Sequence, residues 1–154
     1  MTLYFAYGSN MSRALMAGRC ASARALGTAR LAGYRFIISA DRYASIVPAP
    51  GAAVHGVLWR LAARDLAALN IYESLDSGLY RRVLLPVRHA GGLARALVYV
   101  GRSRRPGTPR PGYHEDIVLP AARAWALPAP YLAELARWSL GLRGASGCEP
   151  GERR

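Results

Sequence analysis

One glutamate in this 154-residue chain lies on a predicted apolar helix face, where a carboxylate is suited to proton transfer. A helix is predicted over 62–75, and in it Leu66, Leu69 and Glu73 fall on one face, because positions i, i+3 and i+7 are neighbours. A carboxylate held among apolar side chains has a raised pKa and suits a general acid or base. The alternative is that the helix ends before residue 73 and leaves Glu73 in solvent.

A second candidate is the turn Gly8-Ser9-Asn10, which follows a predicted strand over 3–7 and precedes a short predicted helix. N–H groups at a helix start favour a negative group, and glycine lets a ligand approach the backbone closely. The turn can therefore hold a carboxylate or a developing oxyanion. An ordinary turn with Asn10 or Ser12 as the helix cap explains the same residues. Ser9 lacks the Gly-x-Ser-x-Gly pattern of a nucleophile elbow, so a structural role is favoured for it.

The histidines and cysteines do not form a metal-binding pattern. His55, His89 and His114 are not spaced three or four residues apart, and no Cys-x-x-Cys occurs, so we expect no metal. Cys20 and Cys148 do not make a disulfide framework, and Cys20 has no obvious histidine partner.

The net charge of +12 allows two interpretations. Taken alone, it indicates a nucleic acid or another polyanion as partner. However, all 21 basic residues are arginine, none is lysine and 28 residues are alanine, which is typical of a genome rich in G and C. The arginines are scattered, so an anionic small substrate fits the charge equally well, and we expect no nucleic-acid partner. Polyanion binding remains the alternative; it would use the arginines of one loop, Arg102, Arg104, Arg105 and Arg110.

The elements that must position these residues are short strands with a few helices. Strands are predicted over 3–7, 28–39 with a bend at Gly33, 43–47 ending at Pro48 and Pro50, 54–61, and a hairpin over 80–89 and 93–100. Besides the helix over 62–75, helices are predicted over 113–127, with a break at Pro120, and from Pro128 to Trp138. Strands with segregated helices predict an α+β domain, in the form of a small barrel.

Length and composition limit the organisation further. The length corresponds to a single domain, assigned to residues 1–140, followed by a mobile tail over 141–154. No apolar run reaches 18 residues, so we expect no membrane segment. The N-terminal residues lack the features of a signal peptide, so a cytoplasmic location is expected.

Several segments together resemble one protein family. Leu3 to Met11 closely resembles the Tyr-Gly-Ser-Asn signature of the gamma-glutamylcyclotransferase family. Further segments of the family are matched in order along residues 2–138: Ala29 to Tyr34, Val54 to Trp59, Asp65 to Glu73 with Gly78-x-Tyr80, and Pro111-Gly112-Tyr113.

The resemblance implies a small, mostly β barrel with flanking helices and one pocket. It also implies an enzyme that releases 5-oxoproline from γ-glutamyl amides without a metal or cofactor. The substrate's own α-amine attacks its γ-carbonyl, with Glu73 as the general acid/base. The turn Tyr7-Gly8-Ser9-Asn10 would anchor the substrate, and Tyr80 and Tyr113 would line the pocket. The leaving amine and the oligomeric state are not indicated.

The chain departs from the family pattern at two positions beside Glu73. Asn70 stands where the family often has aspartate, and Ser74 stands where it often has glycine. These departures motivate the alternative of a non-catalytic module of the same fold that binds a small ligand or a protein. The chain also has Tyr-Gly-Ser-Asn where the glutathione-degrading branch has Tyr-Gly-Ser-Leu, so glutathione is not the first substrate expected.

Overall fold

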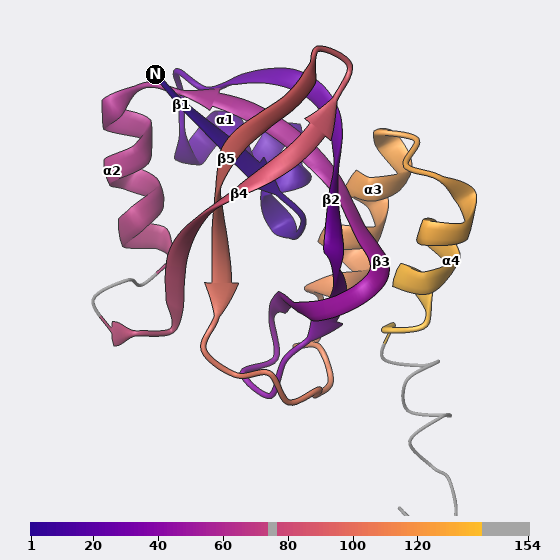
Figure 1. The fold of residues 1–154 in the computed structure, drawn as a ribbon. Coiled ribbons are helices and arrows are strands. Elements are labelled where there is room, and N and C mark those ends of the chain that lie inside the picture. Colours follow the sequence, from indigo (N-terminus) through magenta and orange to yellow (C-terminus); the bar gives the residue numbers. More distant parts are fainter. Residues whose placement is uncertain (74–76, 140–154) are drawn as a thin grey trace, which may run out of the picture.

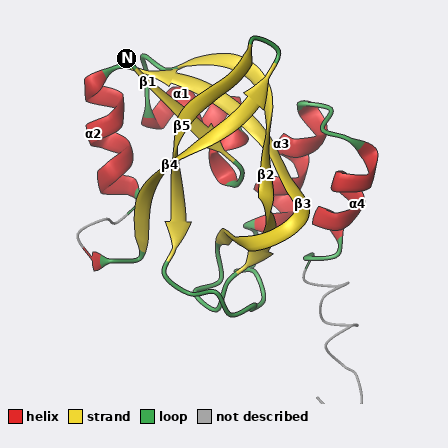
Figure 2. Ribbon diagram, in the orientation of Figure 1, coloured by secondary structure: helices red, strands yellow, loops and turns green. Residues whose placement is uncertain are grey.

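The structure, a computed structural model, describes residues 1–73 and 77–139 and contains a closed five-stranded barrel (Figures 1 and 2). The strands are β1 (Thr2–Ala6), β2 (Arg24–Ile38), β3 (Ala44–Leu61), β4 (Tyr80–His89) and β5 (Gly92–Gly101). The helices are α1 (Arg13–Arg19), α2 (Ala63–Tyr72), α3 (Leu119–Ala124) and α4 (Ala129–Ala136). The predicted α+β class, a small mixed barrel with flanking helices, is confirmed.

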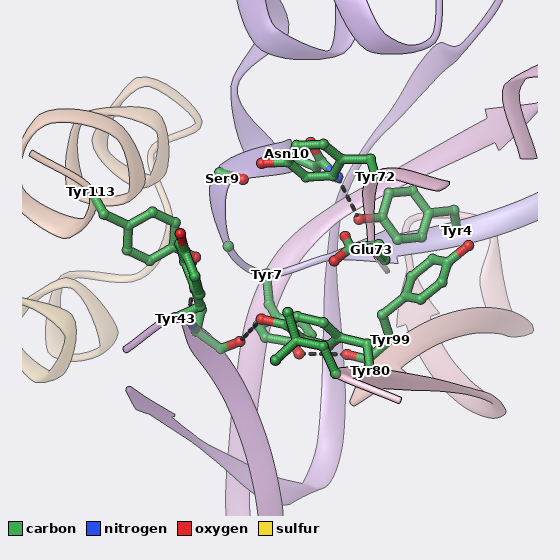
Figure 3. Close-up of a pocket in the computed structure, with 13 residues that line it drawn as sticks. Tyr4, Tyr7, Ser9, Asn10, Tyr43, Tyr72, Glu73, Tyr80, Tyr99 and Tyr113 are labelled. Atoms are coloured by element: carbon green, nitrogen blue, oxygen red, sulfur yellow. Dashed lines mark hydrogen bonds between the residues drawn. The ribbon is translucent and has the colours of Figure 1, made fainter. Parts of the chain in front are cut away.

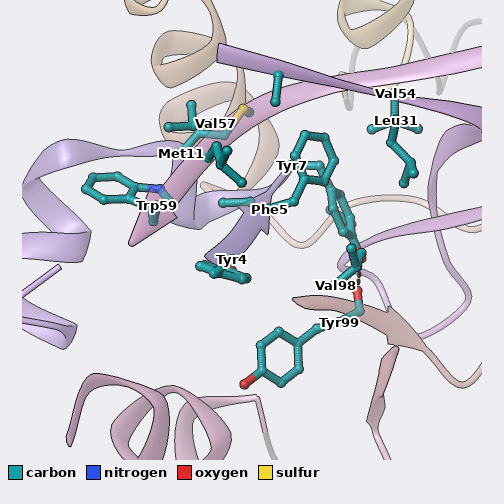
Figure 4. Packing of buried hydrophobic residues seen from close by; sticks show 14 of the residues in the cluster. Tyr4, Phe5, Tyr7, Met11, Leu31, Val54, Val57, Trp59, Val98 and Tyr99 are labelled. Atoms are coloured by element: carbon teal, nitrogen blue, oxygen red, sulfur yellow. Dashed lines mark hydrogen bonds between the residues drawn. The ribbon is translucent and has the colours of Figure 1, made fainter. Parts of the chain in front are cut away.

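Closure of the barrel depends on β1, which lies between β3 and β5. It pairs antiparallel with β3 along its whole length and parallel with β5 at Tyr4 and Leu97. The remaining neighbours pair antiparallel, which gives the strand order β1-β3-β2-β4-β5. Apolar side chains from β1, β2, β3 and β5 pack together in the core (Figure 4). In Figure 1, α2 lies on one side of the barrel, and α3 and α4 lie on the other.

One predicted strand end is wrong. A strand over 43–47 was expected to end at Pro48 and Pro50, but β3 continues through both prolines to Leu61. In this stretch β3 pairs with β2, whereas its pairing with β1 begins only at Val57. This part of β3 is therefore an edge strand, with a neighbour on one side. An edge strand tolerates proline, because on its unpaired side no backbone hydrogen bond depends on the missing N–H. The predicted bend at Gly33 is confirmed by a register shift at that residue, whose φ is +86°.

The helix ends differ from the predictions in detail. Ser12, and not Asn10, caps α1, because its Oγ accepts the N–H of Leu15 at 3.2 Å. The helix expected over 62–75 ends at Tyr72. The helix expected over 113–127 is a π-helical turn over His114–Val118 followed by α3, with Pro120 in the first turn of α3, where a missing N–H is tolerated.

Asp65 links two segments at the start of α2. Its carboxylate accepts the N–H of Ala62 at 2.9 Å and the N–H of Ser22 at 3.1 Å. Asp65 is only 2% exposed, and as an acidic residue in the first turn it also interacts favourably with the helix dipole. It joins the loop after α1 to the helix that carries Glu73.

None of the helices in the described part of the chain has the length and hydrophobicity of a transmembrane segment. The division into a domain over 1–140 and a mobile tail over 141–154 stays a prediction, because residues 140–154 lie outside the described part.

Candidate active site

A pocket opens where the end of β1, the end of α2 and the start of β4 meet (Figure 3). The seven residues predicted to act on or bind the substrate all lie in its wall: Tyr7, Gly8, Ser9, Asn10, Glu73, Tyr80 and Tyr113. The rest of the wall is formed by residues without such a signal: Tyr4, Tyr43, Ala44, Tyr72, Leu79 and Tyr99. Seven of the nine tyrosines of the chain therefore surround one cavity, which gives it many hydroxyl groups and aromatic faces.

Glu73 is the charged side chain among these lining residues. It follows the last residue of α2, and its N–H still donates to the carbonyl oxygen of Leu69 at 2.8 Å. The helix thus ends before residue 73, but the carboxylate is half-buried and faces the pocket (Figure 3). Burial raises the pKa of Glu73 to about 7, and the positive charge of Arg19 opposes this rise. Near neutral pH the group can therefore both take up and release a proton.

The residues after β1 form a short 3₁₀ turn at the pocket wall, Ser9–Met11. The bonds within the turn are donated by the N–H groups of Met11 and Ser12. The N–H groups of Ser9 and Asn10 precede these donors and have no acceptor within the turn. Asn10 is held from three sides, because its carbonyl accepts the indole N–H of Trp59 at 3.1 Å and its amide contacts Tyr4 and Arg19.

The backbone of Ala44, at the start of β3, fixes two pocket tyrosines. Tyr80 donates its hydroxyl proton to the carbonyl of Ala44 at 2.8 Å, and the N–H of Ala44 donates to the hydroxyl of Tyr113 at 3.2 Å. Burial raises the pKa of Tyr80 and of Tyr113 well above the usual range. Both phenols therefore stay neutral. Because the Tyr113 hydroxyl accepts a hydrogen bond from the N–H of Ala44, its own proton is left to be donated to another acceptor.

The tyrosines on the other side of the pocket are held in a similar way. Tyr7 donates to the carbonyl of Tyr99 at 2.5 Å, and the amide of Asn10 donates to the hydroxyl of Tyr4 at 3.1 Å. Burial also raises the pKa of Tyr4 and of Tyr7. The pocket thus presents neutral hydroxyl groups near one carboxylate.

Asn70, one of the two departures from the family pattern, has a defined partner. The hydroxyl of Tyr99 donates to its side-chain oxygen at 2.5 Å, which ties α2 to β5. An amide oxygen accepts such a bond as a carboxylate does, but without a charge. The other departure, Ser74, lies outside the described residues.

Sequence reasoning missed Arg19, which lies just behind the pocket wall. Its Nη1 donates to the Oγ of Ser9 at 3.1 Å and to the Oδ1 of Asn10 at 2.5 Å. Its guanidinium carbon also lies 3.7 Å from the centroid of the Tyr72 ring. The sequence offered no signal for these contacts beyond a basic residue near the predicted end of a short helix.

The remaining sequence candidates lie away from the pocket. The ring of His55 packs against that of Tyr131, with 4.9 Å between the ring centroids. The Nε2 of the buried His114 lies 2.7 Å from the carbonyl oxygen of Leu135. Cys20 is buried at the end of α1. In the ranges 1–73 and 77–139, no three His, Cys, Asp or Glu side chains come together in a way that could hold a metal ion.

Two of the four loop arginines considered for polyanion binding have side-chain partners in the chain. Arg102 forms an ion pair with Asp41 at 3.1 Å. Arg110 lies over the ring of Tyr43, with its guanidinium carbon 5.8 Å from the ring centroid. These contacts give two of the four arginines a structural role within the protein.

Comparison with known proteins adds independent evidence. The family described as gamma-glutamyl cyclotransferase, AIG2-like, matches residues 4–118. The human and mouse proteins named gamma-glutamylcyclotransferase are each 28% identical over 146 residues, covering 86% of this chain and 76% of theirs. A solved structure named gamma-glutamyl cyclotransferase has 26% identity and a TM-score of 0.82, and covers 90% of this chain and 88% of its own. An uncharacterized human protein has 27% identity, a TM-score of 0.81 and the same coverage. Since the family match spans most of the chain and the barrel agrees with it, the protein belongs to the gamma-glutamyl cyclotransferase, AIG2-like family.

Proposed function

We propose that this protein is a gamma-glutamylcyclotransferase that converts a γ-glutamyl amide into 5-oxoproline and a free amine. The observation that carries the proposal is a half-buried carboxylate, Glu73, with a pKa of about 7, in a pocket shared with the turn after β1. The names of the relatives support the same activity.

In the proposed mechanism, Glu73 acts first as a base. It takes a proton from the α-ammonium group of the substrate, because only the free amine is a nucleophile. The amine nitrogen then attacks the γ-carbonyl carbon and closes a five-membered ring. Glu73 returns this proton to the amide nitrogen, and the C–N bond breaks. The ring nitrogen gives up its second proton, through the same carboxylate, to the departing amine, so that 5-oxoproline and the ammonium form of the amine result. Water is not consumed, so the reaction is an internal acyl transfer.

The remaining pocket residues would bind and bend the substrate. The N–H groups of Ser9 and Asn10, with the hydroxyl of Tyr113, would hold the α-carboxylate and the developing oxyanion. Tyr80 would shape the wall on the side of β4. Ring closure is intramolecular, so holding the glutamyl arm in a bent form supplies much of the rate acceleration.

The test of this function is an assay for 5-oxoproline and free amine with a panel of substrates. The panel contains γ-glutamyl amino acids, γ-glutamyl amines and glutathione, and the last is expected to react slowly or not at all. Equal amounts of both products from at least one compound would support the proposal. No turnover, together with a raised melting temperature in the presence of one compound, would instead favour the alternative of a non-catalytic binding module.

The activity is expected to rise with pH through about 7. The base form of Glu73 is needed to start the reaction, and burial raises its pKa to about 7, whereas an ordinary glutamate titrates near 4.3. The measurement is kcat/KM between pH 5 and 9, which reports groups on the free enzyme and free substrate. A plateau already reached at pH 5.5 would contradict the proposed role of Glu73.

Replacing Gly8 with alanine is expected to weaken substrate binding. A Cβ atom at residue 8 would lie 3.1 Å from the hydroxyl oxygen of Tyr113 and 3.1 Å from the Cβ of Ala44. Tyr113 or Ala44 must then give way by a few tenths of an ångström, which displaces the Tyr113 hydroxyl from the place where the substrate would meet it. If the hydrogen bond from Tyr113 to the substrate is lost as a result, a bond of ordinary strength corresponds to a rise in KM of roughly tenfold. An unchanged KM would show that Tyr113 does not contact the substrate, and the melting temperature serves as the control for folding.

A further inference from the structure

Arg19 joins the two segments that form the reactive part of the pocket. It is the last residue of α1, it is half-buried, and it is not itself part of the pocket wall. Its guanidinium group contacts Ser9 and Asn10 on one side and the ring of Tyr72 on the other. All three partners are wall residues, although they come from the turn after β1 and from the end of α2.

The contacts of Arg19 bear on the position of the carboxylate. Tyr72 directly precedes Glu73, so a ring held against the guanidinium group limits where the Glu73 backbone can lie. A planar guanidinium can stack on an aromatic face and donate hydrogen bonds at its edge at the same time. A lysine ammonium cannot do both with the same geometry.

Arg19 also orders the polar groups around the pocket. Because its Nη1 binds the Oδ1 of Asn10 at 2.5 Å, the Nδ2 of Asn10 is turned toward the hydroxyl of Tyr4, to which it donates at 3.1 Å. Tyr4 then accepts from Asn10, and its proton is directed elsewhere.

We propose that Arg19 is a positioning residue for Glu73, which clamps Tyr72 to the Ser9–Asn10 turn and supplies the positive charge that acts on the carboxylate. The inference rests on the proposed function insofar as Glu73 is the base. The charge effect is supported by the lowering influence of Arg19 on the pKa of Glu73, which burial otherwise raises.

The chain offers a matched control for Arg19 on the same helix. Arg13 begins α1, and its guanidinium carbon lies 3.7 Å from the Trp125 ring centroid, the same distance as between Arg19 and Tyr72. Trp125 is not part of the pocket wall. Arg13→Gln therefore removes an equivalent cation–π contact and one positive charge without touching the site.

The experiment compares Arg19→Gln, Arg19→Lys and Arg13→Gln with the wild type. The first readout is the titration of the Glu73 side-chain carboxyl followed by carbon-13 NMR, with the signal assigned by its loss in Glu73→Gln. In Arg19→Gln the midpoint is expected to move upward by roughly one pH unit, the size of effect that a nearby opposite charge produces. In Arg19→Lys the charge is kept and the midpoint stays near that of the wild type, as it does in Arg13→Gln.

The second readout is the pH profile of turnover. At pH 6, kcat/KM of Arg19→Gln is expected to fall about tenfold further than at pH 9, because below the pKa the ionised fraction of the base falls tenfold for each unit by which the pKa rises. At pH 9, where Glu73 is ionised in every variant, both Arg19 variants are expected to keep a reduced kcat, since neither restores the clamp. Arg13→Gln follows the wild type at both pH values.

The possible outcomes separate this inference from the proposed function. A Glu73 titration and pH profile that are the same in Arg19→Gln and Arg13→Gln would overturn the inference while leaving the cyclotransferase activity in place. If the wild type releases no 5-oxoproline from any substrate, the proposed function fails. The NMR titration still tests the inference in that case: a shift in Arg19→Gln alone supports it, and no shift refutes it. Should Arg19→Gln fail to fold, reduced kcat at pH 9 in a folded Arg19→Lys supports the clamp, and wild-type kcat refutes it.

Discussion

Replacing Glu73 with glutamine is expected to lower the release of 5-oxoproline at least 100-fold while leaving the fold intact. The amide has nearly the shape of the carboxylate but cannot accept the proton of the α-ammonium group or return it to the leaving amine. General acid–base catalysis by a positioned side chain typically contributes about 10²–10⁴ in rate. The measurement is kcat/KM at pH 8 with a substrate that the wild type turns over.

The same substitution is expected to raise stability at pH 8. Folding raises the pKa of Glu73 to about 7, so the folded protein favours the protonated carboxyl. The resulting contribution to the free energy of unfolding is complete below the unfolded pKa near 4.3 and is lost as pH rises through about 7. A neutral glutamine avoids this loss, so the melting temperature of Glu73→Gln should exceed that of the wild type at pH 8 but not at pH 4. Inactivity with higher stability cannot be explained by unfolding.

Glu134→Gln is the matched control for this experiment. Glu134 is exposed on α4, away from the pocket, so its replacement removes the same charge from the protein without touching the site. Its activity is expected to equal that of the wild type. If Glu73→Gln retained more than a tenth of the wild-type activity, Glu73 would not be the base, and the mechanism would be wrong.

Replacing Gly56 with alanine is expected to cause the largest loss of stability among the single substitutions considered. Gly56 lies in β3 next to the end of its pairing with β1. An added Cβ would lie 2.2 Å from the carbonyl oxygen of Ala6 and 3.0 Å from the ring of Phe5. Overpacking of a core typically costs about 1–3 kcal/mol. The cost here is expected at or above the upper end, because the obstacle is a backbone atom in a paired strand, which cannot rotate aside.

The effect of Gly56→Ala should extend to the site. Ala6 is followed directly by Tyr7 and the pocket turn, so moving the end of β1 moves these wall residues. The measurement is the free energy of unfolding in urea together with kcat/KM for the folded fraction. Both are expected to fall.

Gly18→Ala provides the comparison. Gly18 lies in α1, nothing lies within 4 Å of an added Cβ, and alanine is favoured over glycine in a helix by about 1 kcal/mol. This variant should therefore be slightly more stable than the wild type and equally active. A Gly56→Ala protein as stable as Gly18→Ala would mean that β1 and β3 are not as close as described.

Local chemistry explains which parts of the fold were predictable. The hairpin of β4 and β5 follows from alternating strands around a glycine turn, and the bend at Gly33 follows from a glycine within a strand. The continuation of β3 through Pro48 and Pro50 was not predictable, because it depends on which neighbour is absent from one edge of the strand. Strand pairing is a long-range property, whereas the proline signal is local.

The sequence by itself identified the candidate base and its partner turn. Spacing predicted Glu73 on an apolar helix face, although α2 ends one residue earlier, and the resemblance joined Glu73 to Tyr7-Gly8-Ser9-Asn10. Only the tertiary structure brought Tyr4, Tyr72 and Tyr99 to the same cavity, because barrel closure sets β1 beside β5 and a hydrogen bond from Tyr99 to Asn70 ties α2 to β5. It alone placed Arg19 against both the turn and Tyr72. The contact between Arg19 and Tyr72 joins residues more than fifty positions apart, and its geometry depends on packing that no local pattern encodes.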